Sequence, residues 1–340
     1  MAQKSVLRGL AIGSGHADAA PAARCPVCDG CGTELVRDAL RHLGSGIPSS
    51  APEGNPLSTV IDVGGIKVSA LNDGEVHLPP MYYPGLDFGA HPELLQADGT
   101  YHIPVGCFLI QAEGLTVLVD AGLGPSTIPF PGDIAAAAGL TDPPESIAAG
   151  GLLPGALAAA GVAPADITTV FLTHLHADHI GWIAPGGVLF FPNAVVMCGA
   201  VEWQTPPIAP APGELEGRMG LAVAKAAGVL RLVDAATVQL APGVSAHHSP
   251  GHTPGHYVVS VSSNGENAYL LGDAVHHPLQ LNDKGISFLS ETEPERALRA
   301  REELLTALQG RNVSIGMTHF PGLDFQRITT TNGREWTTAR

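Results

Sequence analysis

The sequence is poor in charged and aromatic residues. Of its 340 residues, 14% are charged and 5% are aromatic, whereas 45% are hydrophobic. This apolar share excludes wholesale disorder and supplies a sizeable core. The shortage of aromatic residues, together with 42 glycines and 29 prolines, favours many short elements joined by tight turns over a long helical bundle.

Positive charge is scarcer still. The sequence has 17 Lys and Arg against 32 Asp and Glu, a net charge of −15, and no dense basic run. Nucleic acid is therefore excluded as a partner. No apolar run approaches the roughly 18 residues of a membrane span, so no membrane partner is expected. Gly, Ser and His interrupt the apolar residues near the N-terminus, which favours a cytoplasmic location over secretion without excluding secretion.

Cysteine is also infrequent, and its number is odd. The five cysteines are Cys25, Cys28, Cys31, Cys107 and Cys198. An odd number in a chain of this length favours a reducing compartment. The first three follow a C-x-x-C-x-x-C spacing that can hold zinc or an iron–sulfur cluster with a fourth ligand such as His42, but the fourth cysteine is missing. A redox-sensitive tail is the alternative.

Composition divides the chain into three parts. Residues 1–56 read as an appendage and linker that carries the cysteine cluster and one short helix over 33–43. Residues 57–330 read as the main domain, and residues 331–340 as a C-terminal tail. The main domain therefore holds most of the expected core.

Within the main domain, hairpins are expected around Gly64-Gly65 and Glu113-Gly114. Further short strands include GVLFF and AVVMC, and helices are expected over GLLPGALAAAG, Glu214 to Ala227 and Glu293 to Leu308. Runs of strands with helices between and after them predict an α+β fold of two packed sheets with helices outside.

Two long segments, 79–104 and 122–150, show no clear strand or helix pattern. Loops of that length in a compact domain are usually lids or substrate-binding loops. The alternative is that both segments are surface loops without a function.

The densest group of potential metal ligands lies in the segment FLTHLHADHIGW. It places four polar side chains within six positions after an apolar strand: His174, His176, Asp178 and His179. Imidazole and carboxylate suit zinc and similar divalent ions. Alternate residues leaving a strand point to one side, so His174 and His176 can share one ion. The turn that follows lets Asp178 and His179 face a second ion, whereas an ordinary turn would carry Gly, Asn or Ser.

Three later segments bring further potential ligands to strand ends or rigid loops. HHSPGHTPGHYVV contains four histidines, of which His252 or His256 can project from a loop held by Gly and Pro. In NAYLLGDAVHHP an apolar strand runs into Asp273, whose two oxygens can bridge two ions. SIGMTHFP places His319 after the last strong strand. Each signal is weak alone, but one sheet edge can gather them all.

These residues resemble a known family. The run from His174 to His179 matches the HxHxDH signature of the metallo-β-lactamase fold, and His252, Asp273 and His319 follow in the family's order. The resemblance covers about residues 59–325. It implies an αββα sandwich of two mixed β-sheets with helices on the outer faces.

The resemblance also implies roles for individual side chains. His174, His176 and His252 would hold one metal ion, Asp178, His179 and His319 a second, and Asp273 would bridge them. Asp120 would orient a ligand histidine, and His256 would lie behind the ligands. The implied cofactor is two divalent metal ions. Zinc is favoured because position 176 is His, where iron-containing flavodiiron relatives use Glu.

The bridging Asp273 points away from true β-lactamases, which commonly lack it, and toward lactonases, phosphotriesterases, thioesterases and nucleases. The acidity of the chain argues against nucleases. The segment VSALNDGEVHLP resembles the start of methyl-parathion-hydrolase-like and acyl-homoserine-lactonase-like enzymes. Many acyl-homoserine lactonases carry a tyrosine where this sequence has His276. This difference favours a methyl-parathion-hydrolase-like enzyme over a homoserine lactonase. His276 would then contact the carbonyl or phosphoryl oxygen, unless it is a surface histidine.

The predicted activity is hydrolysis of an ester-type bond in a lactone, aryl ester or phosphotriester by a hydroxide that bridges the two metal ions. Asp178 would pass a proton to the leaving group. Four aromatic side chains are expected to line an apolar substrate pocket, with core or lid packing as the alternative: Trp182, Tyr82, Tyr83 and Phe88.

Three other functions stay open. A thioesterase or glyoxalase II-like enzyme would favour cations near the site, and the sequence offers few. An iron-containing persulfide dioxygenase uses similar ligands around one metal. A non-catalytic metal-binding protein is disfavoured because the ligand set is complete. The expected partner is a small-molecule substrate, and the chain is expected to be a monomer or homodimer.

Overall fold

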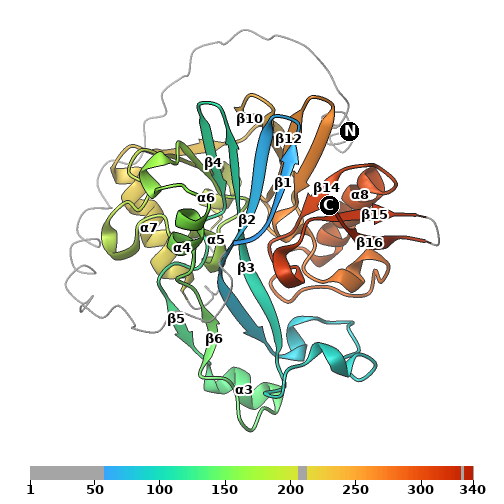
Figure 1. The fold of residues 1–340 in the computed structure, drawn as a ribbon. Helices are drawn as coiled ribbons and strands as arrows, with labels where there is room; N and C mark the ends of the chain where they lie inside the picture. The colour runs from blue at the N-terminus through green and yellow to red at the C-terminus, as the bar shows by residue number, and fades with distance from the viewer. Residues whose placement is uncertain (1–56, 206–212, 331–332, 340) are drawn as a thin grey trace. The chain divides into compact units, whose positions relative to one another are not determined.

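The structure is a computed structural model that describes residues 57–205, 213–330 and 333–339. The helix expected over 33–43 and the cysteine cluster lie outside these ranges. All described elements belong to the unit Ala51–Arg340. They form two mixed β-sheets with helices to either side, which confirms the predicted α+β sandwich (Figure 1).

The first sheet has nine strands in the order β5-β6-β2-β3-β4-β7-β8-β9, with β1 paired to β2. They are β1 (Leu57–Val63), β2 (Ile66–Leu78), β3 (Tyr101–Ala112), β4 (Leu115–Val119), β5 (Thr127–Pro129), β6 (Ser146–Ala149), β7 (Thr169–Phe171), β8 (Val195–Gly199) and β9 (Leu230–Val233). Both expected hairpins are confirmed, since β1 pairs with β2 and β3 with β4 in antiparallel register. From β4 to β9 the neighbours are parallel, so their carboxyl ends meet at one edge.

The second sheet has seven strands in sequence order from β10 to β16. They are β10 (Thr237–Ala241), β11 (Val244–His248), β12 (Tyr257–Ser263), β13 (Glu266–Leu270), β14 (Ser314–Gly316), β15 (Gln326–Thr329) and β16 (Glu335–Thr338). β13 and β14 are parallel, and the other neighbours are antiparallel. Strands β15 and β16 are not predicted from the sequence, because they are short and rich in polar residues.

The main hydrophobic cluster lies between the two sheets. Because successive strand residues point to opposite faces, Phe108, Val119 and Phe171 of the first sheet face the second. There they join Val259 and Leu270 in one buried cluster. This packing sets the distance between the sheet edges from which the polar side chains extend.

The described helices are α3 (Gly132–Ala138), α4 (Leu153–Ala159), α5 (Ala177–Ile180), α6 (Ala200–Gln204), α7 (Glu214–Ala226) and α8 (Pro294–Leu308). Helices α4, α5 and α7 pack on the outer face of the first sheet. Leu118 and Leu172 point to this face and pack in a second cluster with Leu157 of α4, Ile180 of α5 and Leu221 of α7. The three helices expected from sequence correspond to α4, α7 and α8.

Two expectations about secondary structure are wrong. Residues 187–191 do not form a strand, because Phe190 packs between Trp182 and Phe191 in the cluster that faces the helices and no strand pairs with this segment. The segment 122–150, expected to lack regular structure, contains β5, α3 and β6. Its strands have three and four residues, too few for a recognisable alternation of polar and apolar residues.

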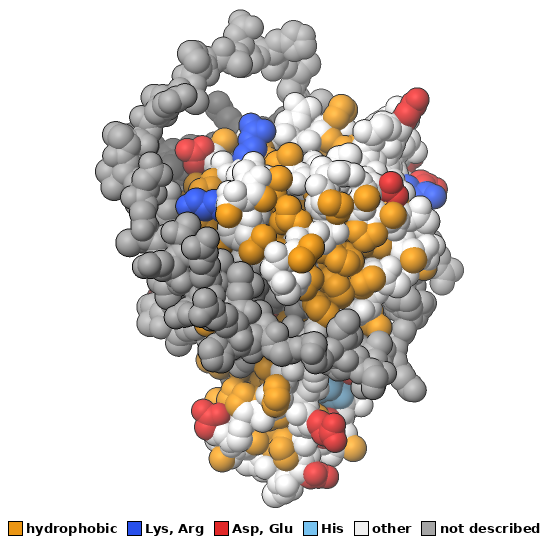
Figure 2. All heavy atoms as spheres, turned by 90° about the vertical axis from the view of Figure 1, so that its left-hand side faces the viewer, with side chains coloured by type: hydrophobic (Ala, Val, Ile, Leu, Met, Phe, Trp, Pro, Cys, Tyr) orange, Lys and Arg blue, Asp and Glu red, His pale blue; other side chains and the backbone are white. Residues whose placement is uncertain are grey.

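Two kinds of surface are visible in Figure 2. Hydrophobic side chains gather on the upper part of the face that Figure 2 shows. Asp and Glu side chains stand out on the lower lobe, which in Figure 1 contains α3, β5 and β6. Among the described residues, no helix has the length and hydropathy needed to cross a membrane.

Candidate metal centre

The segment after β7 supplies the first group of potential ligands. His174 and His176 follow the strand directly, and His176 is the residue that precedes α5. Nε2 of His174 lies 2.9 Å from Nδ1 of His176, which lies 3.0 Å from Nε2 of His252. His252 comes from the loop between β11 and β12, so the structure brings together residues 76 positions apart.

A second group lies beside the first. His179 and Asp178 belong to α5, and His319 follows β14. Nε2 of His319 lies 3.3 Å from Oδ2 of Asp178, and Nε2 of His179 lies 3.8 Å from Oδ1 of Asp178. Ligand atoms of these three residues all lie within 4.8 Å of one another.

Asp273 lies between the two groups. Its Oδ2 is 3.6 Å from Nε2 of His174, 3.4 Å from Nε2 of His252 and 3.4 Å from Nε2 of His319. Its Oδ1 is 3.3 Å from Nε2 of His179. One carboxylate therefore contacts imidazoles of both groups, as the bridging role requires.

The turn that carries Asp273 depends on a glycine. Gly272 has a φ of +51°, and a Cβ there would lie 2.8 Å from Nε2 of His256 and 3.1 Å from Thr173. A side chain at this position would meet both strain and a clash. The Gly-Asp pair thus lets the end of β13 approach the end of β7.

In three of the clustered histidines, the outer ring nitrogen, which is the one that points away from the cluster, lies beside an oxygen atom. Nδ1 of His319 lies 2.8 Å from the Pro104 carbonyl oxygen, Nδ1 of His179 lies 3.0 Å from Oδ2 of Asp120, and Nδ1 of His174 lies 3.1 Å from Oγ1 of Thr173. When the outer nitrogen donates to such an acceptor, the inner Nε2 keeps its lone pair for a metal ion.

The cluster fits metal ions better than protons. The lone pairs of His174, His176 and His252 converge at separations of 2.9 and 3.0 Å, and at most two protons could be shared among them. In the second group, Nε2 of His179 and Oδ1 of Asp273 are buried without a hydrogen-bond partner among the described residues. Imidazole nitrogen with carboxylate oxygen is a zinc-type donor set.

Electrostatics favour the metal-binding protonation states in the first group, whereas in the second group burial alone would lower the pKa of His179 but Asp273 and Asp120 hold it well above its usual range. Burial and the neighbouring imidazoles hold the pKa values of His174 and His252 well below the usual range, so both rings are neutral at neutral pH. Burial alone would raise the pKa of Asp273, but the surrounding imidazoles outweigh it and hold this pKa well below its usual range. Neutral imidazole and ionised carboxylate are the forms that bind metal ions.

Asp120 and His256 lie behind the clustered side chains. Asp120 follows β4 with a φ of +64° and accepts hydrogen bonds from the Thr173 backbone N–H and hydroxyl, which hold it beside His179. Nε2 of His256 accepts from the Asp273 backbone N–H at 3.2 Å. Burial lowers the pKa of His256 to about 3, so its ring stays neutral and can accept.

His276 contacts the shared carboxylate. Its Nε2 lies 3.1 Å from Oδ2 of Asp273, and its ring stacks on Phe288 at a centroid distance of 4.0 Å. His276 is fully buried, so it is not the surface histidine of the alternative interpretation. Sequence analysis missed Phe288, because a single phenylalanine in a loop gives no signal.

The four aromatic residues expected in a pocket separate into two places. Tyr82 and Tyr83 pack on Phe288, and Phe88 packs on Tyr83, so this group adjoins the ring that stacks on His276. Trp182 instead lies in the core cluster between the first sheet and its helices, with its indole N–H donated to Asp73 at 2.7 Å. Its position is that of a core residue and not of a pocket wall.

Asp73 is a buried carboxylate whose role sequence analysis did not identify. It lies in β2 where the pairing register with β3 shifts. Besides Trp182, it accepts hydrogen bonds from backbone N–H groups of Leu123, Gly124, Gly151 and Leu153. It therefore connects β2 to the loops before β5 and α4. The Asp-Gly pair was visible in the sequence, but its distant partners were not.

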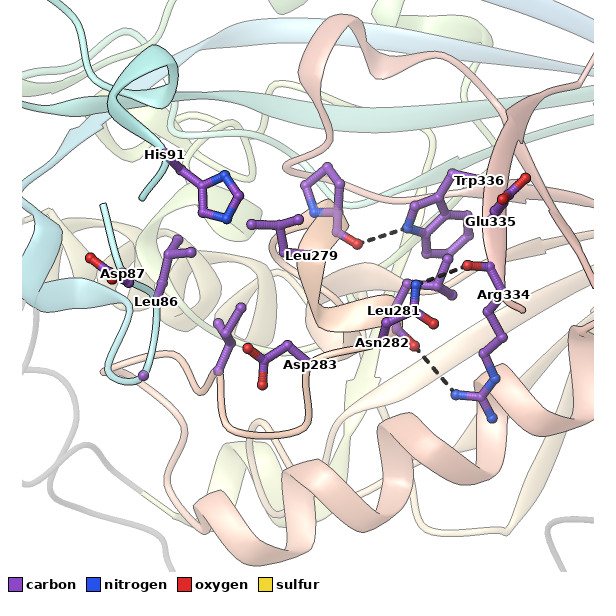
Figure 3. Close-up of a pocket in the computed structure, with 13 residues that line it drawn as sticks. Leu86, Asp87, His91, Leu279, Leu281, Asn282, Asp283, Arg334, Glu335 and Trp336 are labelled. Atoms are coloured by element: carbon purple, nitrogen blue, oxygen red, sulfur yellow. Dashed lines mark hydrogen bonds between the residues drawn. The ribbon is translucent and has the colours of Figure 1, made fainter. Parts of the chain in front are cut away.

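A hollow of about 800 Å³ lies between the loops that carry residues 85–91 and 278–286 and strand β16. Figure 3 shows Trp336 and Arg334 on one side of it and Leu86, Asp87 and His91 on the other. The Trp336 indole N–H donates to the Pro278 carbonyl oxygen at 3.0 Å. None of the seven clustered side chains lines this hollow, so it is separate from the candidate metal centre.

Comparison with known proteins agrees with this geometry. The model of the metallo-beta-lactamase superfamily matches residues 102–312. An N-acyl homoserine lactonase, AiiB of Agrobacterium fabrum, is 41% identical over 81 residues, which are 24% of this chain and 29% of that protein. The matched region thus spans less than a third of the relative.

Two solved structures share the fold over most of the chain. AidC, a dizinc quorum-quenching lactonase solved in complex with a product, has a TM-score of 0.66 and 23% identity, with 84% of this chain and 99% of AidC covered. The hydrolase AbOPH has a TM-score of 0.66 and 20% identity, with 85% and 98% covered. At these identities the likeness concerns the fold.

Proposed function

The chain belongs to the metallo-β-lactamase superfamily, and on this basis we propose that it is a dinuclear metal-dependent hydrolase that cleaves an ester-type bond. The supporting observation is that two largely buried groups of ligand atoms share Asp273. Two divalent ions, with zinc favoured by the donor set, would be held by His174, His176 and His252, by Asp178, His179 and His319, and by Asp273 between them. When bound, such ions lower the pKa of water and polarise the oxygen of a substrate.

The residues of the chain supply the remaining requirements. Asp178 is partly exposed, with 19% of its side-chain surface accessible, so its carboxylate can pass a proton to a leaving oxygen at the mouth of the site. His276 and Phe288 form a buried wall next to Asp273. His276 holds the Asp273 carboxylate in place and lies near the position that a carbonyl or phosphoryl oxygen would take.

A lactone is the first substrate class to test, because a segment of the chain is similar to an N-acyl homoserine lactonase. A phosphotriester is the second, because His276 stands where many acyl-homoserine lactonases carry tyrosine. Aryl esters and thioesters complete the panel, since the same attack at a carbonyl carbon applies to them.

The test combines a metal count with this panel. The full chain, purified without chelator, should hold two divalent ions at the centre and hydrolyse at least one class in a metal-dependent manner. His176→Ala and Asp273→Ala should abolish turnover without unfolding the chain. His91→Gln, which alters an exposed histidine, is the control. Full activity in Asp273→Ala, or no metal-dependent hydrolysis of any class, would refute the proposal.

A further inference from the structure

A second cluster of histidine and carboxylate side chains lies on the first sheet, outside the seven-residue group. Glu75 and His77 are two positions apart on β2, so their side chains share a face of the strand. The strand register places His77 opposite His102 of β3. Their rings stack with a centroid distance of 4.0 Å and an interplanar angle of 20°. Strand pairing alone therefore brings the three side chains together.

The inner atoms of this cluster face one another. Nε2 of His77 lies 3.0 Å from Oε1 of Glu75, and Nδ1 of His102 lies 3.9 Å from Oε2 of Glu75. One ligand atom from each residue lies within 4.8 Å of the others. The carboxylate thus lies within reach of both imidazoles.

The outer nitrogens lie beside hydrogen-bond acceptors, since the Thr100 hydroxyl, also 3.1 Å from Nε2 of His102, donates its own proton to Asp98. Nδ1 of His77 lies 2.9 Å from the Ser146 carbonyl oxygen of β6. Nε2 of His102 lies 3.1 Å from Oδ2 of Asp98. Each outer nitrogen therefore carries the ring proton, and in the neutral ring the inner nitrogen presents a lone pair toward the Glu75 carboxylate. Two lone pairs that face an anion favour a cation between them, either a proton or a metal ion.

We propose that Glu75, His77 and His102 bind a divalent transition-metal ion of the zinc class, in addition to the two ions proposed for the candidate metal centre. Two imidazole nitrogens and one carboxylate oxygen are three ligands of a zinc-type donor set. Water can complete the coordination, because 46% of the Glu75 side-chain surface is accessible. The Asp98 carboxylate behind His102 orients the ring, as outer carboxylates do in zinc sites.

The charge of the surroundings favours a cation. Between Lys67 and Arg218 the sequence has no lysine or arginine but fifteen Asp and Glu residues. Acidic side chains also stand out on the lobe that contains α3, β5 and β6 (Figure 2). Ser146 of β6, whose carbonyl oxygen holds His77, belongs to this lobe. A negative potential raises the local concentration of cations.

A proton is the competing occupant. Burial lowers the pKa of His77, but the Glu75 carboxylate, the Ser146 carbonyl and Asp98 together outweigh it, so the ring gains a proton more readily than a free histidine. A metal ion must displace that proton, and its affinity should therefore fall as the pH is lowered. The metal therefore gains over the proton as the pH is raised.

Occupation of this cluster would fasten the ends of β2 and β3. Glu75 pairs in register with Pro104, and the Pro104 carbonyl oxygen lies 2.8 Å from Nδ1 of His319. The metal would thus secure the strand segment that orients one histidine of the candidate centre.

The test counts metal ions in the full chain and in matched variants. Zn²⁺ is titrated at pH 7.5 in competition with a chromophoric chelator, and the protein-bound zinc is counted. The wild-type chain is expected to bind one more ion than His102→Gln and one more than Glu75→Gln. Loss of a ligand should weaken this site by more than about 100-fold, and Asp98→Asn should weaken it by about 10–100-fold.

The control is His91→Gln, because His91 forms an exposed pair with Glu93 but has no third ligand beside it in the described part of the chain. It should bind as many ions as the wild type. Equal zinc counts and affinities in the wild type and Glu75→Gln would overturn the proposal, because Glu75 is partly exposed and its replacement leaves the core intact. Each comparison measures a difference of one ion, so the result does not depend on how many ions the candidate metal centre holds.

Discussion

At the scale of single residues, the function of a histidine depends on what its outer nitrogen contacts. His179 has Asp120 behind it at 3.0 Å, whereas His256 turns a lone pair toward a backbone N–H. The first ring can bind a metal, and the second supports the turn that carries Asp273. The same ring type thus fills two roles because its hydrogen-bond partners differ.

Asp120→Asn tests this dependence. Asn tolerates the left-handed backbone at this position, so the fold should survive. The amide replaces a charged acceptor beside His179, and metal affinity or turnover should fall about 10–100-fold. Zinc titration and steady-state kinetics measure the effect, with the exposed Asp62→Asn as control. Unchanged affinity and turnover would show that Asp120 does not orient His179.

His276 allows a second test at this scale. His276→Phe removes the contact with Oδ2 of Asp273 but can keep the stacking on Phe288. Turnover should fall roughly 10–100-fold while both metal ions are retained. His276→Tyr should shift the ratio of lactone to phosphotriester turnover toward the lactone. If neither variant changes turnover or this ratio, the residue has no role in the reaction.

Sequence predicted the clustered residues better than their surroundings. The dense run of His174, His176, Asp178 and His179 stands out in the sequence. Asp273 and His319 were weak signals alone, and the resemblance to the metallo-β-lactamase fold selected them together with His252. Phe288 and the partners of Asp73 were missed because phenylalanine and Asp-Gly pairs occur in many settings. Trp182 was expected to line a pocket. Its place in the core could not be predicted, because its hydrogen bond to a carboxylate 109 positions away cannot be seen in the sequence.

At the scale of elements, Asp73 shows how one side chain fixes several loops. Burial raises the pKa of Asp73 to about 6, although hydrogen bonds from Leu153, Trp182 and other donors lower it. Between the unfolded value of about 4 and this value, the folded chain binds more protons at Asp73 than the unfolded chain does. This group's contribution to the free energy of unfolding therefore decreases as the pH rises from about 4 to about 6.

Asp73→Asn should remove that pH dependence. The difference between wild type and variant in the free energy of unfolding should change by about 3 kcal/mol across this range. The variant should also be less stable at every pH. Its amide NH2 group would face the backbone N–H donors of Leu123 and Gly124 and leave them without an acceptor. Urea unfolding at several pH values measures both effects, and a difference that stays constant with pH would contradict the raised pKa.

Helix α8 positions the loop that carries Phe288. Its Arg301 donates to Oε1 of Glu291 at 3.1 Å and to the Ile286 carbonyl oxygen at 3.0 Å, and both charged side chains are about 1% exposed. Arg301→Met leaves Glu291 buried without its partner and should destabilise the chain by about 3–5 kcal/mol. Thermal unfolding measures this loss. The double variant Arg301→Met/Glu291→Met should recover part of it, and no recovery would show that the ion pair is not the cause.

Helices and strands could be predicted where the sequence pattern of polar and apolar residues extends over several positions. The two hairpins and helices α4, α7 and α8 follow from alternation, turn residues or amphipathic spacing over several residues. β5, β6, β15 and β16 have only three or four residues each, which is too short to show a period. The pairing of these strands depends on neighbours that are distant in the sequence.

At the scale of the whole molecule, the candidate centre exists because parallel strands bring distant segments together. β7 pairs with β4 in one sheet, and β14 pairs with β13 in the other. The carboxyl ends of these strands lead to Asp120, His174, Asp273 and His319. Their order in the sequence indicated that they converge, but the distances between them required the structure.

Removal of the metal ions should therefore weaken the entire fold. The cluster joins both sheets, and metal ions that bind only the folded chain stabilise it by about 4 kcal/mol when present at roughly 1,000 times the dissociation constant. For a chain of this size, chelation should lower the melting temperature by roughly 5–10 °C. Differential scanning calorimetry with and without chelator measures the shift, and added Zn²⁺ should reverse it. Asp273→Ala should show only a small part of this shift, because it lacks the carboxylate shared by the two groups. A wild-type shift no larger than that of Asp273→Ala would mean that the ions do not connect the two sheets through this cluster.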